Sequence, residues 1–388
     1  MPDIHKIPRG KKMKNILLSS AAIALLAGAA SAEVTWSGDA ELGYNDEPGL
    51  YDGFYYDLGL TLGLSQELNN GWTASVTADI DFTSAEYQTT QGTGLSFLDA
   101  TSTSDIVLTL SNDVFALTYG DVETVFTSFD LVNDFYEPVA DEAEDFLADV
   151  SVLKAEADFG AYSVGVSTFL SSDFGPAAED FGIQFFASAE LGMVDLGFFY
   201  AEEDTTYADY MMDSDYEQLE TILLSAKTSL GGAELTFNAG TLDGDAGYGL
   251  AVAYPVGPVT IGANVNYAEA YAEEMAYGVN VAYSDGPISI YAYYEDAYNE
   301  EEFGVAGSYD MGNGLVVTAG TIDGDDDTDN DFASYIVAEY DLGGGASFLA
   351  SYADATSYDK SGDLDDIDTS LGGYELNYGA TLALSFEF

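Results

Sequence analysis

The stretch ELNYGATLALSFEF (375–388) alternates in character at every second position. A period of two is the period of a β-strand, in which neighbouring side chains point to opposite faces. Small or polar residues fall on one face. The other face carries Tyr378, Ala380, Leu382, Leu384, Phe386 and Phe388. The stretch therefore predicts a strand, and it leaves open whether that strand lies in water or in lipid.

The start of the chain decides between these two surroundings. The stretch MKNILLSSAAIALLAGAASA (13–32) has a lysine near its start, an apolar run over 16–30, and small residues before Glu33. This is the pattern of a secretory signal peptide. We expect residues 1–12 to be an upstream extension with the true start at Met13, cleavage after Ala32, and a mature domain over 33–388.

The mature chain is extremely acidic. Without residues 1–32 it has no Arg, His or Cys, and it keeps 68 carboxylates against three lysines, a formal charge of −65. Such a chain repels nucleic acid, which is excluded as a partner. A solvated surface suited to a saline habitat is the alternative explanation of the charge.

The missing residue types also limit the chemistry. Without His or Cys there is no Ser-His-Asp or Cys-His system and no ordinary zinc site. A carboxylate pair for glycoside hydrolysis is compatible with the composition, but neighbouring acids are expected by chance in so acidic a chain. We therefore expect no enzyme.

Hairpins repeat along the mature chain. WTASVTADIDF (72–82) and VTIGANVNY (259–267) both alternate apolar and polar residues. Short turn signals begin near positions 69, 111, 159, 191, 230, 255, 284, 311 and 342, and longer acidic connections separate the hairpins. Nine such hairpins and the strands near 33 and 376 predict twenty strands, with sixteen or eighteen as alternatives.

Two internal repeats bear on this number. AGTLDGD (239–245) recurs as AGTIDGD (319–325), and VAYPVGPVTI (252–261) recurs as VAYSDGPISI (281–290). Added hairpins keep the number of strands even, as a closed antiparallel barrel requires.

Alternating strands with short turns at one end and long loops at the other predict a transmembrane antiparallel β-barrel. Inside a bilayer every backbone group must be paired within the protein, so a sheet that spans it must close on itself. A secreted acidic β-sandwich or solenoid is the soluble alternative.

The chain resembles the Gram-negative porins of α-proteobacteria. The resemblance is carried by AEVTWSGDAELGY (32–44), VFALTYGDVET (114–124), YDLGGGASFLASY (340–352) and the C-terminal strand. That strand resembles the assembly signal of outer-membrane barrels, at Asn377, Gly379, Leu382, Leu384 and Phe388. The resemblance implies a homotrimeric, water-filled pore in the outer membrane. It also implies lipid, lipopolysaccharide and the assembly machinery as partners, and a loop after the fifth strand that folds inward.

By position this constriction loop is 120–149, the longest interval without a convincing strand. An external loop on the barrel rim is the alternative. Its candidate pore residues are all acidic: Asp121, Glu123, Asp130, Asp134, Glu137, Asp141, Glu142, Glu144, Asp145 and Asp149.

The expected inward phase of the strands is acidic too. A ring of carboxylates concentrates cations and excludes anions. The sequence therefore predicts a cation-preferring pore for small hydrophilic solutes. A selective channel for cationic nutrients and a non-conducting structural or adhesin barrel are the alternatives. The candidate wall residues are Asp39, Glu41, Asp57, Asp79, Asp81, Lys154, Glu156, Asp158 and Lys227.

One acidic stretch has the density of oxygen ligands that Ca²⁺ or Mg²⁺ favours. DGDDDTDND (323–331) is not an EF-hand, and a solvated external loop, bridged to lipopolysaccharide through divalent ions, is the alternative. No other cofactor is expected. The candidate ligands of a weak site are Asp323, Asp325, Asp327 and Asp329.

Overall fold

The computed structural model describes residues 32–46, 53–68, 70–83, 104–128, 151–169, 182–203, 219–269, 275–297, 300–323, 332–355 and 367–388. The described part of the chain contains no helical segment with the length and hydropathy of a membrane span. The predicted signal peptide lies outside these ranges apart from Ala32.

The described residues form twenty long strands, one 3₁₀ turn and one short hairpin. The strands of the large sheet are β1 (Glu33–Asn45), β2 (Gly53–Glu67), β3 (Thr73–Thr83), β4 (Ser104–Ser111), β5 (Phe115–Gly120), β6 (Val152–Asp158), β7 (Tyr162–Phe169), β8 (Ile183–Glu190), β9 (Val194–Ala201), β10 (Thr221–Leu230), β11 (Ala233–Leu242), β12 (Asp245–Val256), β13 (Val259–Ala268), β14 (Met275–Asp285), β15 (Ile288–Ala297), β16 (Glu300–Asp310), β17 (Leu315–Asp323), β18 (Phe332–Gly343), β19 (Ala346–Ala355) and β22 (Gly379–Glu387). The remaining elements are η1 (Val125–Ser128), β20 (Ile367–Asp368) and β21 (Glu375–Leu376).

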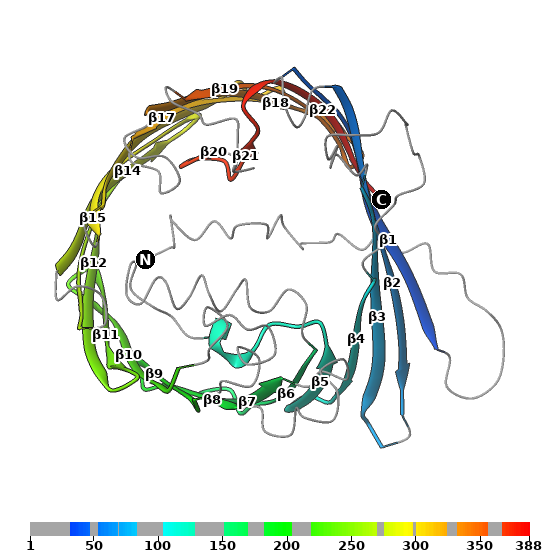
Figure 1. Cartoon of the computed structure of the whole chain (residues 1–388), viewed down its shortest axis with the longest axis vertical. Coiled ribbons are helices and arrows are strands. Elements are labelled where there is room, and N and C mark those ends of the chain that lie inside the picture. Colours follow the sequence, from blue (N-terminus) through cyan, green and yellow to red (C-terminus); the bar gives the residue numbers. More distant parts are fainter. Residues whose placement is uncertain are drawn as a thin grey trace, which may run out of the picture.

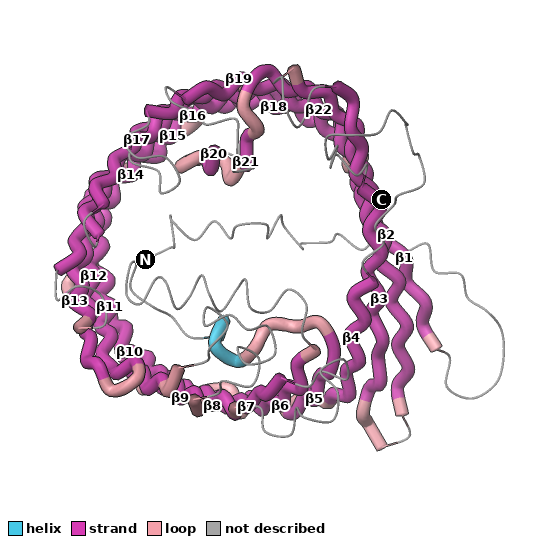
Figure 2. Tube along the Cα trace, in the orientation of Figure 1, coloured by secondary structure: helices cyan, strands magenta, loops and turns pink. Residues whose placement is uncertain are grey.

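These strands close into a ring. Each pairs antiparallel with its neighbours along the chain, β19 pairs with β22, and β22 pairs with β1. Figures 1 and 2 show the resulting barrel in a view along its opening, with η1 and the β20–β21 hairpin inside it. The prediction of a closed antiparallel barrel is confirmed, and twenty strands is the correct one of the three numbers.

The seam between β1 and β22 is short. Six residue pairs join the two strands, from Asp39 opposite Glu387 to Tyr44 opposite Leu382. Beyond them Phe388 exchanges two backbone hydrogen bonds with Gly38, at 2.8 and 2.9 Å. The terminal phenylalanine therefore belongs to the closure of the barrel.

All nine predicted short turns join consecutive strands at one end of the barrel. The repeated segments 252–261 and 281–290 form equivalent hairpins, β12–β13 and β14–β15. Each turns at a Gly-Pro pair whose glycine has positive φ, 63° at Gly257 and 57° at Gly286. A side chain with a Cβ rarely adopts this conformation, so glycine is the residue that permits the tight turn.

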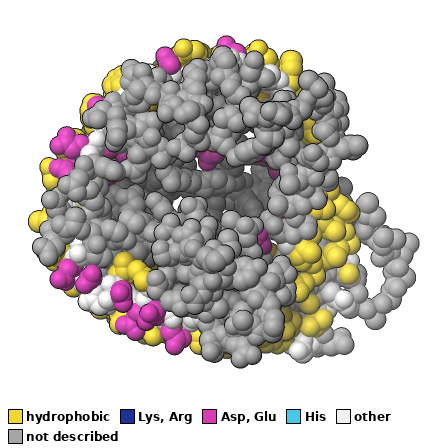
Figure 3. All heavy atoms as spheres, viewed as in Figure 1, with side chains coloured by type: hydrophobic (Ala, Val, Ile, Leu, Met, Phe, Trp, Pro, Cys, Tyr) yellow, Lys and Arg dark blue, Asp and Glu magenta, His cyan; other side chains and the backbone are white. Residues whose placement is uncertain are grey.

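The two faces of the sheet differ in chemistry. On β1, Trp36 and Leu42 are 51% and 53% exposed, while the opposite phase carries Asp39 and Glu41. Large apolar side chains are exposed on the outer phase of nearly every strand, and Figure 3 shows them on the outer wall, with carboxylates at the rim and in the hollow. A soluble sheet would bury these side chains, whereas lipid solvates them.

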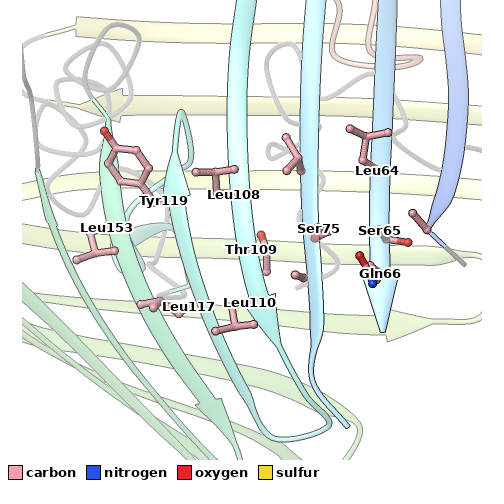
Figure 4. A pocket seen from close by; sticks show the side chains of 13 residues that line it. Leu64, Ser65, Gln66, Ser75, Leu108, Thr109, Leu110, Leu117, Tyr119 and Leu153 are labelled. Carbon is pink, nitrogen blue, oxygen red and sulfur yellow. The ribbon is translucent and has the colours of Figure 1, made fainter. Parts of the chain in front are cut away.

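A shallow depression of about 460 Å³ lies on this outer wall over β2 to β6. Figure 4 shows Leu64, Leu108, Leu110, Leu117 and Leu153 around it. These leucines have the outward phase of their strands, so the depression faces the lipid side and belongs to the hydrophobic wall.

Two parts of the inner wall carry apolar instead of polar side chains. Phe186, Phe199 and Leu223 form one apolar patch on β8 to β10, and Val125 of η1 is buried on it. Ile322 and Val337 belong to a second patch on β16 to β19, which Ile367 and Leu376 of the short hairpin cover. Buried apolar clusters therefore lie where chain segments fold into the barrel.

Candidate pore lumen

The carboxylate of Glu41 lies on the inner wall at the seam. Its Oε1 accepts a hydrogen bond from the hydroxyl of Tyr55 at 3.0 Å, and its Oε2 accepts one from Ser385 at 2.7 Å. Asp39 has the same phase, and its carboxylate lies against Gly59 on the neighbouring strand. The register therefore turns both predicted acids of β1 to the interior.

The acids of β2 and β3 continue this wall. Asp57 has the phase of Tyr55, and Asp79 accepts a hydrogen bond from Thr61 on the adjacent strand. Asp81 belongs to the same phase of β3, but its side chain lies outside the described atoms. Four of the five predicted wall acids of the first strands are thus described, and all four face inward.

The two predicted inward lysines have acidic neighbours. Lys154 Nζ lies 3.6 Å from Glu156 Oε2, on the inner phase of β6. Lys227 is opposite Asp195 in the register of β10 and β9. Asp158 stands at the end of β6, where its carboxylate accepts a hydrogen bond from Gly160 N at 2.7 Å and caps the turn. Neither lysine therefore stands alone as a positive site on the described wall.

The segment after β5 turns into the barrel at Gly120. Val125 N donates a hydrogen bond to Ser167 Oγ at 3.1 Å, and the Val125 side chain is fully buried against β8 to β10. Phe126 adds an edge contact with Phe199, with ring centroids 5.0 Å apart. The described beginning of the predicted constriction loop thus lies on the inner wall.

The predicted acids of this loop divide into two groups. Asp121 and Glu123 are described and are partly buried beside the wall. The others lie outside the described residues: Asp130, Asp134, Glu137, Asp141, Glu142, Glu144, Asp145 and Asp149.

The inner phase also carries acids that were not among the predicted wall residues, and three glutamates of β15, β16 and β18 are examples. Glu295 and Glu302 are opposite each other on β15 and β16, and Glu339 lies on β18. The hydroxyl of Tyr293 hydrogen-bonds Glu302, as Tyr55 does with Glu41. The alternation of these strands contains the signal, because each glutamate has the phase opposite to the lipid-facing residues.

The inward tyrosines lie along the wall because the residue opposite is glycine. Gly43 is opposite Tyr55, and Gly304 is opposite Tyr293. At both glycines an added Cβ would overlap the tyrosine ring. The small partner therefore lets the ring lie flat and directs its hydroxyl to the carboxylate.

A second segment, β20–β21, also lies inside the barrel, and it was not predicted from the sequence. Its Tyr374 hydroxyl donates a hydrogen bond to Glu339 Oε2 at 2.7 Å. Burial, and then the bond to Glu339, raise the pKa of Tyr374. The hydroxyl therefore stays protonated and remains a donor well into the alkaline range.

The predicted assembly-signal residues belong to the last strand and its approach. Leu382, Leu384 and Phe388 have the outward phase, Gly379 begins β22, and Asn377 is partly buried just before it. The strand closes the barrel through its pairs with β1 and β19.

The predicted divalent-cation site is not placed by the structure. Asp323 ends β17, while Asp325, Asp327 and Asp329 lie outside the described residues. Within the described ranges, no group of three or more possible ligand side chains gathers around a common point.

The chain is similar to one protein family and to several solved structures. A family model described as Gram-negative porin matches residues 19–301. No curated protein matches the chain significantly. Two solved variants of the porin of Rh. blastica are each 14% identical. The first alignment covers 71% of this chain and 98% of the porin variant, with a TM-score of 0.44. The second alignment covers 92% of this chain and 100% of the other variant, with a TM-score of 0.41. A triple mutant of the Rhodopseudomonas blastica porin is 15% identical. Its alignment covers 92% of this chain and 100% of the mutant, with a TM-score of 0.41.

A closed β-barrel with an apolar outer wall and a polar inner wall is the architecture of a transmembrane β-barrel protein of the outer membrane. The family match covers well over half of the chain, and the chain belongs to the Gram-negative porin family. It is therefore a passive diffusion channel of the outer membrane and not an enzyme.

Proposed function

We propose that this porin prefers cations and conducts ions and small hydrophilic solutes through an acidic, water-filled pore. The observation that carries the proposal is the sign of the charges on the inner wall. Asp39, Glu41, Asp57 and Asp79 line the first three strands, and Glu295, Glu302 and Glu339 lie on the inner phase of β15, β16 and β18.

The basic side chains of the described inner wall do not offset this charge. Lys154 has Glu156 beside it, and Lys227 is opposite Asp195. The third lysine of the chain after the predicted signal peptide, Lys360, lies outside the described residues. Carboxylates of one sign around a narrow path attract cations and repel anions, and low-dielectric walls strengthen the effect.

The constriction is part of the same proposal. η1 holds the start of loop 120–149 on the inner wall, and Asp121 and Glu123 at this start add further negative charge. We also propose a cleaved signal peptide ending at Ala32 and a homotrimeric assembly. N-terminal sequencing of the purified protein and its mass by light scattering in detergent test these two points.

The ion preference is tested in a planar bilayer with a KCl gradient. We expect a reversal potential whose sign shows that K⁺ permeates more readily than Cl⁻. The triple variant Glu41→Gln, Asp57→Asn, Asp79→Asn should move it towards zero. Glu301→Gln is the matched control, because Glu301 is exposed on the outward phase of β16. A reversal potential on the anion side in the native protein would contradict the proposal.

The same recordings separate the alternatives. A channel selective for cationic nutrients would be blocked by one organic cation at low concentration while its relatives pass. A barrel with only a structural or adhesive role would give no steps of current at all.

A further inference from the structure

The hairpin β20–β21 covers an apolar part of the inner wall. On β16 to β19 the inward phase carries Ile322, Tyr335 and Val337 together with small alanines, and all are buried. Polar residues are expected at lumen-facing positions of a barrel with an aqueous pore. An apolar patch there indicates that a protein segment covers it permanently.

The covering segment supplies matching apolar side chains. Ile367 and Leu376, opposite each other in the hairpin, are 0% and 3% exposed. Leu371 and Tyr374 pack on the edge of the same cluster. The hairpin thus buries one apolar face on the wall and leaves its other face to the lumen, where Glu375 is exposed.

Polar contacts close the hairpin and fix it to the wall. The hydroxyl of Thr369 accepts a hydrogen bond from Tyr374 N at 3.0 Å, and Thr369 N donates to Tyr374 O at 2.9 Å. Tyr374 then bonds Glu339 on β18. Just after the hairpin, Tyr378 O accepts a hydrogen bond from Asn45 Nδ2 at 2.9 Å, at the seam of the barrel. The hairpin is therefore held at its tip and at its base.

The position of the hairpin relative to η1 gives it a role in permeation. η1 is docked on the wall around β7 to β10, and the hairpin is docked around β16 to β19, nine strands further along a ring of twenty. Figure 1 shows the two segments inside the barrel on opposite sides. Two segments that project from opposite walls narrow a pore more than either alone.

We propose that the β20–β21 hairpin is a second permanent constriction of this porin. Together with η1 it sets the size limit for solutes, and Glu375 is a residue of the ion path. The inference rests on the proposed diffusion function, but not on its ion preference.

The chain has no cysteine, so a single introduced thiol reports only its own position. The first experiment labels Glu375→Cys with a bulky neutral thiosulfonate reagent during single-channel recording. We expect a loss of part of the step amplitude on labelling. Asp285→Cys is the matched control, because it also removes one acid but lies exposed at a short turn. Its step should not change.

A second variant tests the docking without a label. Ile367→Ser with Leu376→Ser removes both apolar anchors and keeps the net charge. We expect a larger or noisier step than in the native protein. An unchanged step after labelling of Glu375→Cys, or a native step in the double variant, would overturn the inference. An anion-side reversal potential with a reduced step on labelling would overturn the cation preference and leave the second constriction in place.

Discussion

The docking of η1 is the contact whose loss should be easiest to see in a single channel. Val125 is fully buried in the patch of Phe186, Phe199 and Leu223, and its backbone N–H is bonded to Ser167. Val125→Asn replaces an apolar side chain by a polar one of similar size and leaves the net charge unchanged. Any change in current is then a change of shape.

The magnitude follows from burial. Fully burying a valine side chain stabilises the docked segment by about 1.5–2 kcal/mol, which the substitution removes. A buried amide without partners costs about 1–3 kcal/mol more. The total of about 2.5–5 kcal/mol shifts the equilibrium between the docked and the released segment by a factor of about 60 to 4,000.

The assay is single-channel recording in symmetric KCl. A released segment moves within the lumen, so we expect higher open-channel noise and brief partial closures. Thr127→Asn is the matched control, because Thr127 lies on the same 3₁₀ turn with its side chain exposed. If Val125→Asn gives the same noise and a single step like the native protein, η1 is not held by this contact.

Three further outcomes follow from the wall and the seam. Asn45→Ala removes the buried amide that donates hydrogen bonds to Tyr378 and Thr381, so the free energy of unfolding should fall by about 1–3 kcal/mol. In gel electrophoresis after heating, the folded band should then convert to the unfolded band at a lower temperature. An unchanged conversion temperature would refute this expectation. Gly304→Ala should push the ring of Tyr293 off the wall and reduce the step, and a native step would show that the ring has room. The raised pKa of Tyr374 means that its bond to Glu339 contributes fully below the ordinary value of 10.0 and is lost as the pH rises through the higher folded value. The step should thus be constant up to that pH, and a change already near neutrality would contradict the assignment.

Much of the barrel is encoded locally. The alternation in β22 and the turn residues of the nine short hairpins involve positions a few residues apart, and they predicted the strands and their two faces. The inward phase of Asp39 and Glu41 followed from the same alternation. These features need no knowledge of distant contacts.

The interior contacts of the barrel were not readable in this way. Glu41 meets Ser385 across a separation of 344 residues, and Asn45 meets Thr381 across 336. Closure alone brings these residues together. The second inward segment was missed because its anchors, Ile367 and Leu376, are sparse in an acidic stretch that resembles an external loop.

Residue type and short-range spacing were enough to predict the strands, the turns and the apolar and polar faces of the barrel. The tertiary structure alone decided which connections enter the lumen. A loop folds inward only where it meets an apolar patch assembled from several strands, as Val125 does on β8 to β10 and Ile367 does on β16 to β19. Such a patch exists only once the ring has closed.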